Sequence, residues 1–475
     1  MDKSVPLAAA VLLALASALA VFAMIGRVEL TFDEAYYTLW SRALAFGYLD
    51  HPPMVALWIR ASTTLFGGSE FGVRALGAAL FALAPALVGY GAARLYSSVR
   101  IGAFAALAWL AMPLSAGAAL VTPDAPLTLF SLVTLVGLIE VFRGRSLGWA
   151  VVGVALGLAL QSKFTALFLG AGMAVALVAV PSLRPQGRRP APYLAALTAL
   201  AIYTPFLVWN ATHGFMTFAK QFARVPGHGF RPGYLGEFVG AQLGLANPLL
   251  AAAAAPAVAG AFRKDETASP ARLLIAYVAP ALVYFFVHSL HDRVQGNWTA
   301  PLYPALAMLM GAGAADGPLW ARRAAKAGMA LGFALLALVY LHVATGWPAL
   351  GAADPLARIG GWRELVRQVD TQAHDEGAAF VIARGYAATS LLTYYGDGAL
   401  PVAELGEPER WLFAPPVPLP PAAPGLAFGE AGRGFGDDLR ARFRIVAPLG
   451  GLTRRQGGAE VEAYEAYRVA EPIGE

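Results

Sequence analysis

Long apolar runs separated by short polar stretches occupy the first three quarters of the chain. A helix that crosses a bilayer needs about 20 apolar residues, or somewhat fewer when it is short or tilted. The pattern therefore predicts about eleven transmembrane helices. Their expected ranges are Val5–Ile25, Phe71–Ala93, Ile101–Leu120, Ala125–Phe142, Leu147–Gln161, Phe164–Val180, Tyr193–Val208, Leu245–Ala261, Leu273–Leu290, Pro301–Ala315 and Ala327–Thr345.

The first run also sets the expected orientation of the chain. Because no clear small-residue cleavage site precedes Arg27, we interpret the run as a retained anchor rather than a signal peptide. Lys3, on its N-terminal side, places the N-terminus in the cytoplasm. Other Lys and Arg residues collect in alternate loops, as expected of cytoplasmic loops. An odd number of spans then puts the first loop and the C-terminal region outside.

The pattern changes past Gly346, where the long apolar runs stop. The stretch GWRELVRQVDTQAHDEG predicts a helix, AAFVIARGY a strand, and SLLTYYGD a helix or a second strand. We therefore predict two domains. Residues 1–346 form a polytopic α-helical membrane domain with extracytoplasmic loops at about 27–70, 121–124 and 209–244, and residues 347–475 form a small extracytoplasmic α/β domain.

Composition agrees with a membrane protein and excludes some other classes. The chain is 58% hydrophobic and 14% charged, which suits a lipid-embedded protein. Its net charge is +5, but the basic residues are scattered between apolar runs instead of forming a continuous face, so we do not expect nucleic-acid binding. The chain has no cysteine, which excludes disulfides and thiolate chemistry.

Spaced glycines in two apolar segments predict close helix packing. Gly153 with Gly157, and Gly236 with Gly240 and Gly244, have the small-xxx-small spacing that lets helix backbones approach each other. Nucleotide binding by these glycines would require a preceding strand, and none is expected here.

Charged and imidazole side chains lie beside helix ends on the expected outer side. Such groups cost about 3 kcal/mol each near bilayer depth on insertion scales, so their positions are informative. They come from the first loop, the turn LVTPDAPL and the short link LQSKFTAL. The residues are Asp33, Glu34, Arg42, Asp50, His51, Arg60, Asp124 and Lys163.

Each of these residues also has an ordinary structural explanation. An aspartate near a helix start, such as Asp33 or Asp124, often caps the helix. Lys163 is able to snorkel toward the lipid headgroups, and His51 before Pro52 is able to close a turn. The joint occurrence of acidic, basic and imidazole groups in separate outer loops nevertheless fits one polar cleft better than independent accidents.

A cleft of this kind suits a substrate that is itself half lipid. Transfer of a group from a lipid phosphate requires a carboxylate that deprotonates the acceptor and cations that stabilise the departing phosphate. The 209–244 loop adds groups suited to phosphate contacts or metal binding, although their spacing matches no metal signature. These are His213, Lys220, Arg224, His228, Arg231 and Glu237.

Five stretches of the chain together resemble a known family. They are TFDEAYYTLWSRALAFGYLDHPP, TPDAPLTLF, QSKFTALFL, FLVWNATHGF and DRVQGNWTAPLYP, which span most of Leu30–Pro304. In this order they resemble the bacterial members of the protein O-mannosyltransferase superfamily, the GT-C fold glycosyltransferases that include the lipid A aminoarabinose transferase. The resemblance implies a multi-pass enzyme of the bacterial inner membrane. Such an enzyme transfers a sugar, with inversion, from a polyprenyl-phosphate donor to an acceptor on the periplasmic side.

The resemblance also implies roles for individual residues. The acidic pair at the reaction centre corresponds to Asp33, as base or acceptor orienter, and Glu34 beside it. Asp124 matches the acid of the second outer loop, and Lys163 the lysine that binds the donor phosphate. The further candidates for binding the donor phosphate are Arg42, His51 and Arg293, which lie in the same stretches.

The position of His51 departs from the family pattern, because the aminoarabinose transferase has lysine there. Histidine binds phosphate only when it is protonated. Either another cation takes the phosphate, or His51 holds a divalent metal ion together with Asp50. His213 is the third candidate ligand in that case.

The acceptor is left open at this point. Lipid A or the lipopolysaccharide core is favoured because of the related transferase, and a protein hydroxyl or another envelope glycan is the alternative. A transporter or flippase of lipid-linked sugars would predict two related halves with broken helices, and the sequence shows neither. A scaffold would not need Asp33, Asp124 and Lys163 at converging loop ends.

Overall fold

The computed structural model of the protein describes residues 4–223, 229–263 and 269–473. The chain divides into two compact units. The helical unit comprises Met1–Ala23, Asp50–Trp58 and Arg74–Tyr340, and the sheet unit comprises Met24–Leu49, Ile59–Val73 and Leu341–Glu475.

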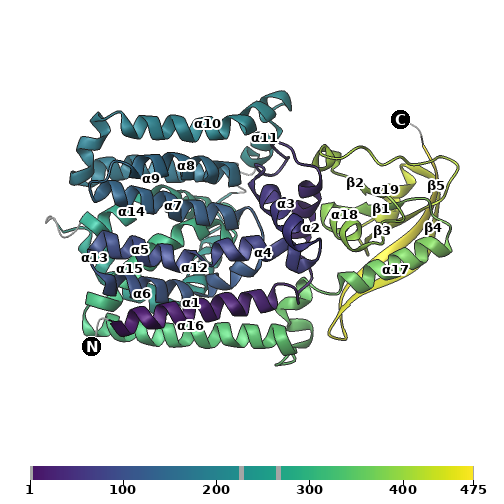
Figure 1. Ribbon diagram of the computed structural model, residues 1–475. Coiled ribbons are helices and arrows are strands. Elements are labelled where there is room, and N and C mark those ends of the chain that lie inside the picture. The colour runs from purple at the N-terminus through teal and green to yellow at the C-terminus, as the bar shows by residue number, and fades with distance from the viewer. Residues whose placement is uncertain (1–3, 224–228, 264–268, 474–475) are drawn as a thin grey trace. The chain divides into compact units, whose positions relative to one another are not determined.

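Apolar helices make up the helical unit, and several of them run side by side (Figure 1). Neighbouring pairs include α5 with α6, α7 with α8, and α8 with α10. The helices that lie wholly or mostly in this unit are α1 (Ser4–Met24), α4 (Glu70–Phe81), α5 (Ala84–Tyr96), α6 (Val99–Ala111), α7 (Asp124–Phe142), α8 (Gly148–Ser162), α9 (Leu167–Ala179), α10 (Ala191–Thr212), α11 (Met216–Phe222), α12 (Gly233–Ala246), α13 (Pro248–Gly260), α14 (Ser269–His288), α15 (Tyr303–Asp316) and α16 (Leu319–Thr345).

Each of the segments expected to span the membrane overlaps a helix. Within the described ranges, six helices are long and apolar enough to cross a bilayer, or up to eight if each of two bent pairs forms one span. The six are Pro6–Met24, Glu70–Tyr96, Asp124–Phe142, Ala191–Thr212, Ser269–His288 and Leu319–Thr345. Shorter apolar helices include α6 and α8. A total of about eleven spans remains a prediction.

The expected span Leu245–Ala261 begins just before a sharp bend. It corresponds to α13, and only Leu245 and Ala246 belong to α12, which meets α13 at 93°. Asn247 lies at the bend with φ 66°, and its side chain caps α13 by accepting a hydrogen bond from Leu249 N. Its amide also donates to Gly328 O over 2.7 Å, which fixes the bend inside the bundle. The break begins here because Pro248 cannot continue a helical hydrogen-bond ladder.

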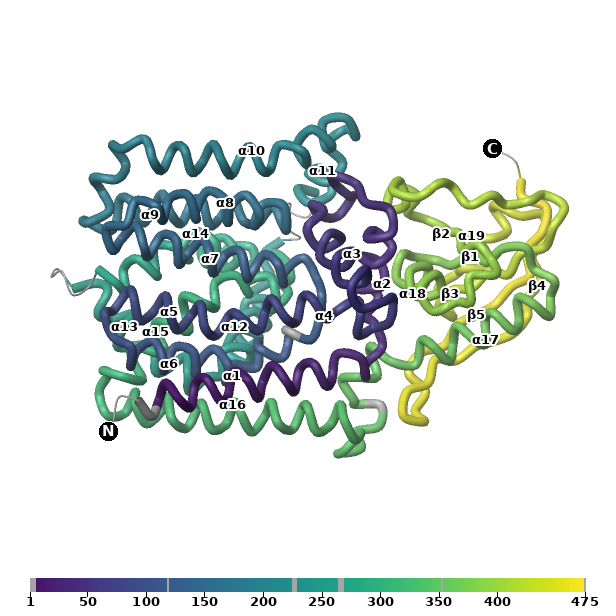
Figure 2. The backbone as a smooth tube through the Cα atoms, viewed as in Figure 1, coloured from purple at the N-terminus to yellow at the C-terminus, as the bar shows by residue number. Residues whose placement is uncertain are grey.

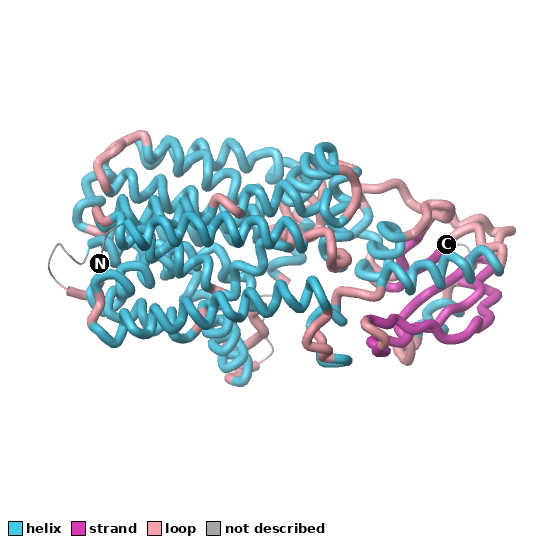
Figure 3. The backbone as a smooth tube through the Cα atoms, turned by 60° about the horizontal axis from the view of Figure 1, so that its bottom comes forward, coloured by secondary structure: helices cyan, strands magenta, loops and turns pink. Residues whose placement is uncertain are grey.

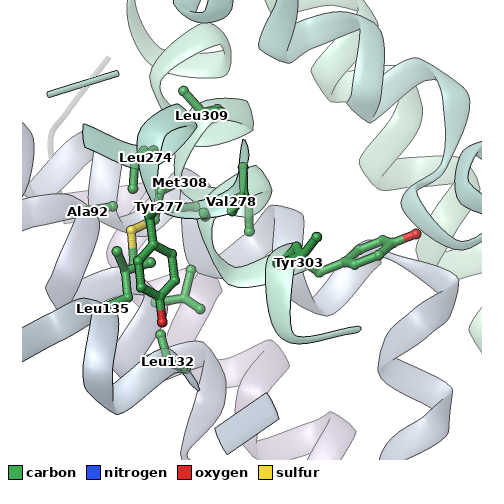
Figure 4. Packing of buried hydrophobic residues seen from close by; sticks show 14 of the residues in the cluster. Ala92, Leu132, Leu135, Leu274, Tyr277, Val278, Tyr303, Met308 and Leu309 are labelled. Carbon is green, nitrogen blue, oxygen red and sulfur yellow. The ribbon is translucent and has the colours of Figure 1, made fainter. Parts of the chain in front are cut away.

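Buried aromatic and aliphatic side chains fill the interior of the helical unit. Figure 4 shows the ring of Tyr277 on α14 among Leu132, Leu135 and Met308. Its hydroxyl donates to Ser131 O over 2.9 Å, so the one polar atom of this side chain is satisfied inside the core. This contact connects α14 to α7, the helix that carries Asp124.

The glycine prediction holds for one segment only. A Cβ at Gly153 would lie 2.9 Å from Ala195 O, and a Cβ at Gly157 would lie 2.7 Å from the Cβ of Ile202, so both glycines allow α8 to approach α10 closely. The prediction is wrong for Gly236, Gly240 and Gly244, because a Cβ at each of them would meet nothing within 4 Å.

A mixed five-stranded sheet lies in the C-terminal part of the sheet unit, where all strands of the described residues are found (Figure 3). The strand order is β2-β1-β3-β5-β4, in which β1 pairs parallel with β2 and β3, and β5 pairs antiparallel with β3 and β4. The elements are α17 (Trp362–Asp375), β1 (Val381–Arg384), α18 (Tyr386–Tyr395), β2 (Val402–Leu405), β3 (Gly425–Glu430), α19 (Phe435–Arg440), β4 (Phe443–Gln456) and β5 (Ala459–Pro472).

The predicted helix and strand after Gly346 are confirmed as α17 and β1, and SLLTYYGD lies largely in helix α18. Small hydrophobic cores support this arrangement, with Phe380, Ile382 and Phe435 almost completely buried in one of them. The long hairpin of β4 and β5 was not predicted. Its turn uses Gly457 and Gly458, which both have positive φ and so suit a tight reversal.

Part of the first loop folds together with the C-terminal segment. It contains α2 (Phe32–Arg42) and leads to α3 (Met54–Phe66), which contributes to both units. Helix α18 lies beside α2 (Figure 2). The hydroxyl of Tyr395 accepts a hydrogen bond from Leu30 N over 2.7 Å, and the carboxylate of Glu29 accepts one from Trp362 N over 2.8 Å. The segment that carries Asp33 is therefore packed against residues far along the chain.

Candidate active site

The candidate residues are distributed over both units. Asp33, Glu34 and Arg42 belong to the sheet unit, whereas Asp50, His51, Asp124, Lys163, His213 and Arg293 belong to the helical unit.

Glu34 stabilises the start of α2. Thr31 is the N-cap, and its hydroxyl accepts a hydrogen bond from Glu34 N, while the carboxylate of Glu34 accepts one from Thr31 N over 3.0 Å. This reciprocal pair is a capping box, which satisfies backbone N–H groups that a helix start leaves open. Glu34 is fully buried, so its carboxylate has a clear structural task. The catalytic role of Glu34 remains a prediction.

Asp33, the neighbouring residue on α2, makes a different contact. It is partly buried, and its Oδ1 accepts a hydrogen bond from the hydroxyl of Tyr386 over 3.2 Å. Tyr386 is the first residue of α18. The two acids of the pair are therefore held differently, Glu34 by its own helix start and Asp33 by a side chain from the C-terminal segment.

Asp124 and Lys163 form an ion pair in the helical unit. Asp124 is the first residue of α7, and Lys163 follows the last residue of α8, so the short links at these helix ends bring them together. Lys163 Nζ lies 2.8 Å from Asp124 Oδ1, and each residue is 8% exposed. Lys163 Nζ also lies 5.9 Å from the ring centre of Trp298. Lys163 is buried and paired with a carboxylate inside the protein, whereas a snorkelling lysine would extend its ammonium group toward the lipid headgroups.

A third side chain completes this cluster. Asn297 Nδ2 donates to Asp124 Oδ2 over 2.7 Å, so both oxygens of the carboxylate have a partner. We call Asp124, Lys163 and Asn297 the acid–lysine–amide cluster. Asn297 was not among the site residues predicted from the sequence, although it lies in the motif DRVQGNWTAPLYP and could have been found there.

The segment that carries Asn297 is held on two sides. It is the 3₁₀ helix η5 (Gly296–Leu302), and its Thr299 hydroxyl donates to Gln242 Oε1 on α12. On the other side, Ser131 of α7 donates to Pro301 O over 2.8 Å. Because α7 contacts η5 here and also begins with Asp124, one helix sets the position of both the carboxylate and the amide that binds it.

A second ion pair involves Asp50. Its Oδ1 lies 3.8 Å from Lys220 Nζ, and its backbone carbonyl accepts a hydrogen bond from Gln221 Nε2 over 2.8 Å. Asp50 is 6% exposed. The short helix α11, which lies within the expected 209–244 loop, therefore binds the turn that contains Asp50 and His51.

The tentative metal ligands are not brought together as a set. The ring of His213 stacks on Trp209 at 4.2 Å, and its Nδ1 lies 2.8 Å from Trp209 O. Among the described residues, no group of three or more His, Cys, Asp or Glu side chains is placed to hold a metal ion. We therefore derive no step through a metal. Arg224 and His228 lie outside the described residues.

The remaining phosphate candidates lie on exposed surface. Arg293 is paired with Glu237 over 2.8 Å, and the two side chains are 66% and 50% exposed. Arg42, at the end of α2, is exposed and lies over the ring of Tyr394 at 6.0 Å. Surface ion pairs of this kind contribute little to stability, so Arg293 is able to exchange its partner for a phosphate at small cost.

Comparison with solved structures shows that the fold is that of the GT-C protein ArnT. Two crystal structures of ArnT from Cupriavidus metallidurans are similar to this chain over 96% of its length and 97% of theirs. The apo structure gives a TM-score of 0.67 at 16% identity, and the structure bound to undecaprenyl phosphate gives 0.68 at 17%. At this identity the likeness establishes the fold.

Two sequence comparisons point to the same class. Residues 50–209 match the family model described as dolichyl-phosphate-mannose-protein mannosyltransferase. The lipid A galacturonosyltransferase RgtD of Rhizobium johnstonii is 29% identical over 280 residues. That match covers 58% of this chain and 58% of RgtD. The relatives found are GT-C glycosyltransferases, so the resemblance indicated by the motifs is confirmed.

Proposed function

We propose that this protein is a membrane glycosyltransferase that moves a monosaccharide, with inversion, from a polyprenyl phosphate to lipid A. The observation that carries the proposal is the buried acid–lysine–amide cluster, which places an ammonium group at a helix end in a GT-C fold. Two similar proteins support the proposed donor and acceptor. One ArnT structure holds undecaprenyl phosphate, and RgtD is named as a lipid A galacturonosyltransferase.

The proposed reaction needs one base and one phosphate-binding site. An acceptor hydroxyl oxygen attacks the anomeric carbon of the donor, the carbon–oxygen bond to the phosphate breaks, and the hydroxyl proton passes to the carboxylate of Asp33. Polyprenyl phosphate departs carrying the additional negative charge. Lys163 binds this phosphate, and Asp124 holds the ammonium group in place through the pair described above.

Glu34 and the exposed arginines have supporting roles in this proposal. Glu34 holds the start of α2 and so orients Asp33. Arg42, Arg293 and His51 are secondary contacts for the phosphate, with His51 acting only in its protonated form. Asp50 fixes the turn before His51 through Lys220.

The similar proteins suggest which donor sugars to test first. RgtD is named for galacturonic acid, so a hexuronic acid is the first donor to test, and aminoarabinose is the second. A protein hydroxyl remains the alternative acceptor, because the matching family model describes protein mannosyltransferases. The transporter alternative is favoured by the two bent helix pairs of the described residues, one of which is α12 with α13.

The proposed setting is the bacterial inner membrane. The N-terminus is cytoplasmic and the C-terminal sheet lies in the periplasm, as the distribution of Lys and Arg between the loops predicts. Short apolar helices such as α6 and α8 bring the number of spans toward about eleven.

Transfer by the purified protein tests the proposal. The protein in detergent is incubated with lipid A and undecaprenyl phosphate-linked galacturonic acid, and in parallel with the aminoarabinose donor. Mass spectrometry of lipid A should show addition of one sugar residue with one of the two donors and none with the Asp33→Asn variant. Lipid A that stays unmodified with both donors, while a membrane protein fraction gains sugar, would replace lipid A by the protein acceptor. Absence of any transfer would contradict the proposal.

A further inference from the structure

Tyr386 links the C-terminal segment to the proposed base. Its hydroxyl donates a hydrogen bond to Asp33 Oδ1 over 3.2 Å, although the two residues are far apart in sequence. We propose that Tyr386 is a positioning residue for Asp33 and that the C-terminal segment therefore takes part in the chemical step as well as in folding. This inference rests on the proposed function, since it assigns a partner to the base of that reaction.

The Tyr386 ring is itself held firmly. The guanidinium carbon of Arg410 lies 4.1 Å from its ring centre, and the rings of Tyr36 and Phe32 lie 5.2 Å and 5.8 Å away. A cation over an aromatic face is an attractive contact that gains strength away from water. The ring thus has neighbours on α2 and in the segment after β2, which restricts its rotation.

Arg410 is anchored in turn. It is 8% exposed, its Nε lies 2.7 Å from the carboxylate of Glu407, and its backbone carbonyl accepts a hydrogen bond from the hydroxyl of Tyr36 over 3.1 Å. A buried cation without a partner would be costly, so the pair with Glu407 is what allows Arg410 to remain beneath Tyr386. The side chain that supports Tyr386 is therefore fixed at both its backbone and its charged end.

Both ends of α18 make hydrogen bonds with residues at or just before the start of α2. Tyr386 at its first turn reaches Asp33, and Tyr395 at its last residue accepts from Leu30 N and donates to Glu70. Two contacts separated by the length of a helix fix both translation and rotation of that helix. The Tyr386 hydroxyl consequently meets the Asp33 carboxylate in a single register.

The expected effect of this contact is on the chemical step rather than on donor binding. A hydroxyl that donates to a carboxylate oxygen orients the carboxylate and stabilises its ionised form, which is the form that accepts a proton. A base that is displaced or freely rotating loses rate because the reacting atoms must be aligned. Donor affinity, which the proposal assigns to Lys163, should not depend on Tyr386.

The test combines stability with kinetics in the full-length protein. A thermal double-mutant cycle of Tyr386→Phe and Asp33→Ala, in which each single change removes the hydrogen bond, requires no substrate, and the two shifts in unfolding midpoint should be non-additive because the groups are in contact. With the active donor of the transfer assay, Tyr386→Phe should lower kcat by about 10-fold to 100-fold and leave the donor KM within about 2-fold.

Tyr464→Phe is the matched control. It removes a second tyrosine hydroxyl of the sheet unit that donates to a carboxylate, Glu462, over 2.6 Å, and the Tyr464 residue is buried. This variant should keep the kcat of the parent protein. Additive midpoint shifts in the cycle, or an unchanged kcat in Tyr386→Phe, would overturn the positioning role. Non-additive shifts in the cycle, together with no transfer by the parent protein, would instead overturn the proposed function. The inference would then fall with it.

Discussion

Lys163 Nζ lies 2.8 Å from Asp124 Oδ1, and both side chains are 10% exposed. This pair joins the end of α8 to the start of α7, and Asn297 adds the rigid segment η5. Removing one member of a buried ion pair leaves an uncompensated charge, and this costs far more than the pair itself contributes. The pair thus has two roles, one in the stability of the fold and a proposed one in binding the donor phosphate. Different variants test the two roles separately.

Donor binding tests the proposed role of Lys163. Lys163→Ala should weaken the binding of undecaprenyl phosphate by about 10-fold to 100-fold, because a charge-assisted contact to the phosphate is lost. Binding is measured on the purified protein by native mass spectrometry at several lipid concentrations. Lys326→Ala, an exposed lysine on α16, is the control. Equal affinity in the Lys163 variant and the control would assign Lys163 a purely structural role.

The free energy of unfolding tests the structural role of the Asp124–Lys163 pair. Asp124→Ala should destabilise the protein by about 3–5 kcal/mol, since Lys163 would remain buried without its partner. The double variant Asp124→Asn/Lys163→Met, which removes both charges, should recover much of that loss while still failing to bind the donor. Chemical denaturation in detergent measures both effects. A double variant less stable than Asp124→Ala would contradict this account.

Glu34 should tolerate a substitution that Asp33 does not. The amide oxygen of Gln accepts the hydrogen bond from Thr31 N, so Glu34→Gln should retain the capping box and most of the transfer rate. Glu34→Ala should lose about 1 kcal/mol of stability as the cap is lost. Transfer rates and unfolding midpoints of the two variants are compared with those of Asp33→Asn. A Glu34→Gln protein that folds but is as inactive as Asp33→Asn would return Glu34 to a direct catalytic role.

The sheet unit carries a carboxyl group with an altered pKa. Burial, followed by the nearby Asp397 charge, raises the pKa of Asp370 above its ordinary value of 3.8. The folded state therefore holds this proton to higher pH than the unfolded state, so Asp370 lowers stability as pH rises from about 4 through the raised pKa.

Replacing the carboxyl group should remove this pH dependence. Asp370→Asn should increase hydrogen-exchange protection of β1 and β3 at pH 7, with the difference from the parent protein shrinking toward pH 4. Asp375→Asn on the same helix, where the side chain is 72% exposed, serves as the control. Protection that falls in Asp370→Asn at pH 7 would show that the ionised carboxylate stabilises the fold.

Sequence patterns predicted those parts of the fold that depend on local physics. Apolar runs located the helices, because burial in lipid requires uninterrupted apolar segments. The bend at Asn247 was missed because the cap depends on a contact with Gly328, which is distant in sequence. The hairpin of β4 and β5 was missed because few residues of its two strands are fully buried, so the strands show no clear buried face in the sequence pattern.

The candidate site shows the same division. Asp124 and Lys163 were predicted to share a polar cleft. The structure brings them into contact because Asp124 begins α7 and Lys163 follows the end of the adjacent helix α8. Tyr386 was not predicted, since its contact with Asp33 arises only when α18 packs on α2. Arg293 belongs to a motif of the family, yet the structure pairs it with Glu237 on exposed surface, which sequence spacing does not reveal.

In the proposed function, Asp33 serves glycosyl transfer from a polyprenyl phosphate. Mass spectrometry of the polyprenyl-phosphate sugars in membranes of cells that carry the parent protein or Asp33→Asn at equal abundance tests this role. One lipid-linked sugar should accumulate in the variant, because its consumption has stopped, and the corresponding sugar should disappear from lipid A. Identical lipid profiles together with unchanged lipid A would overturn the assignment of Asp33.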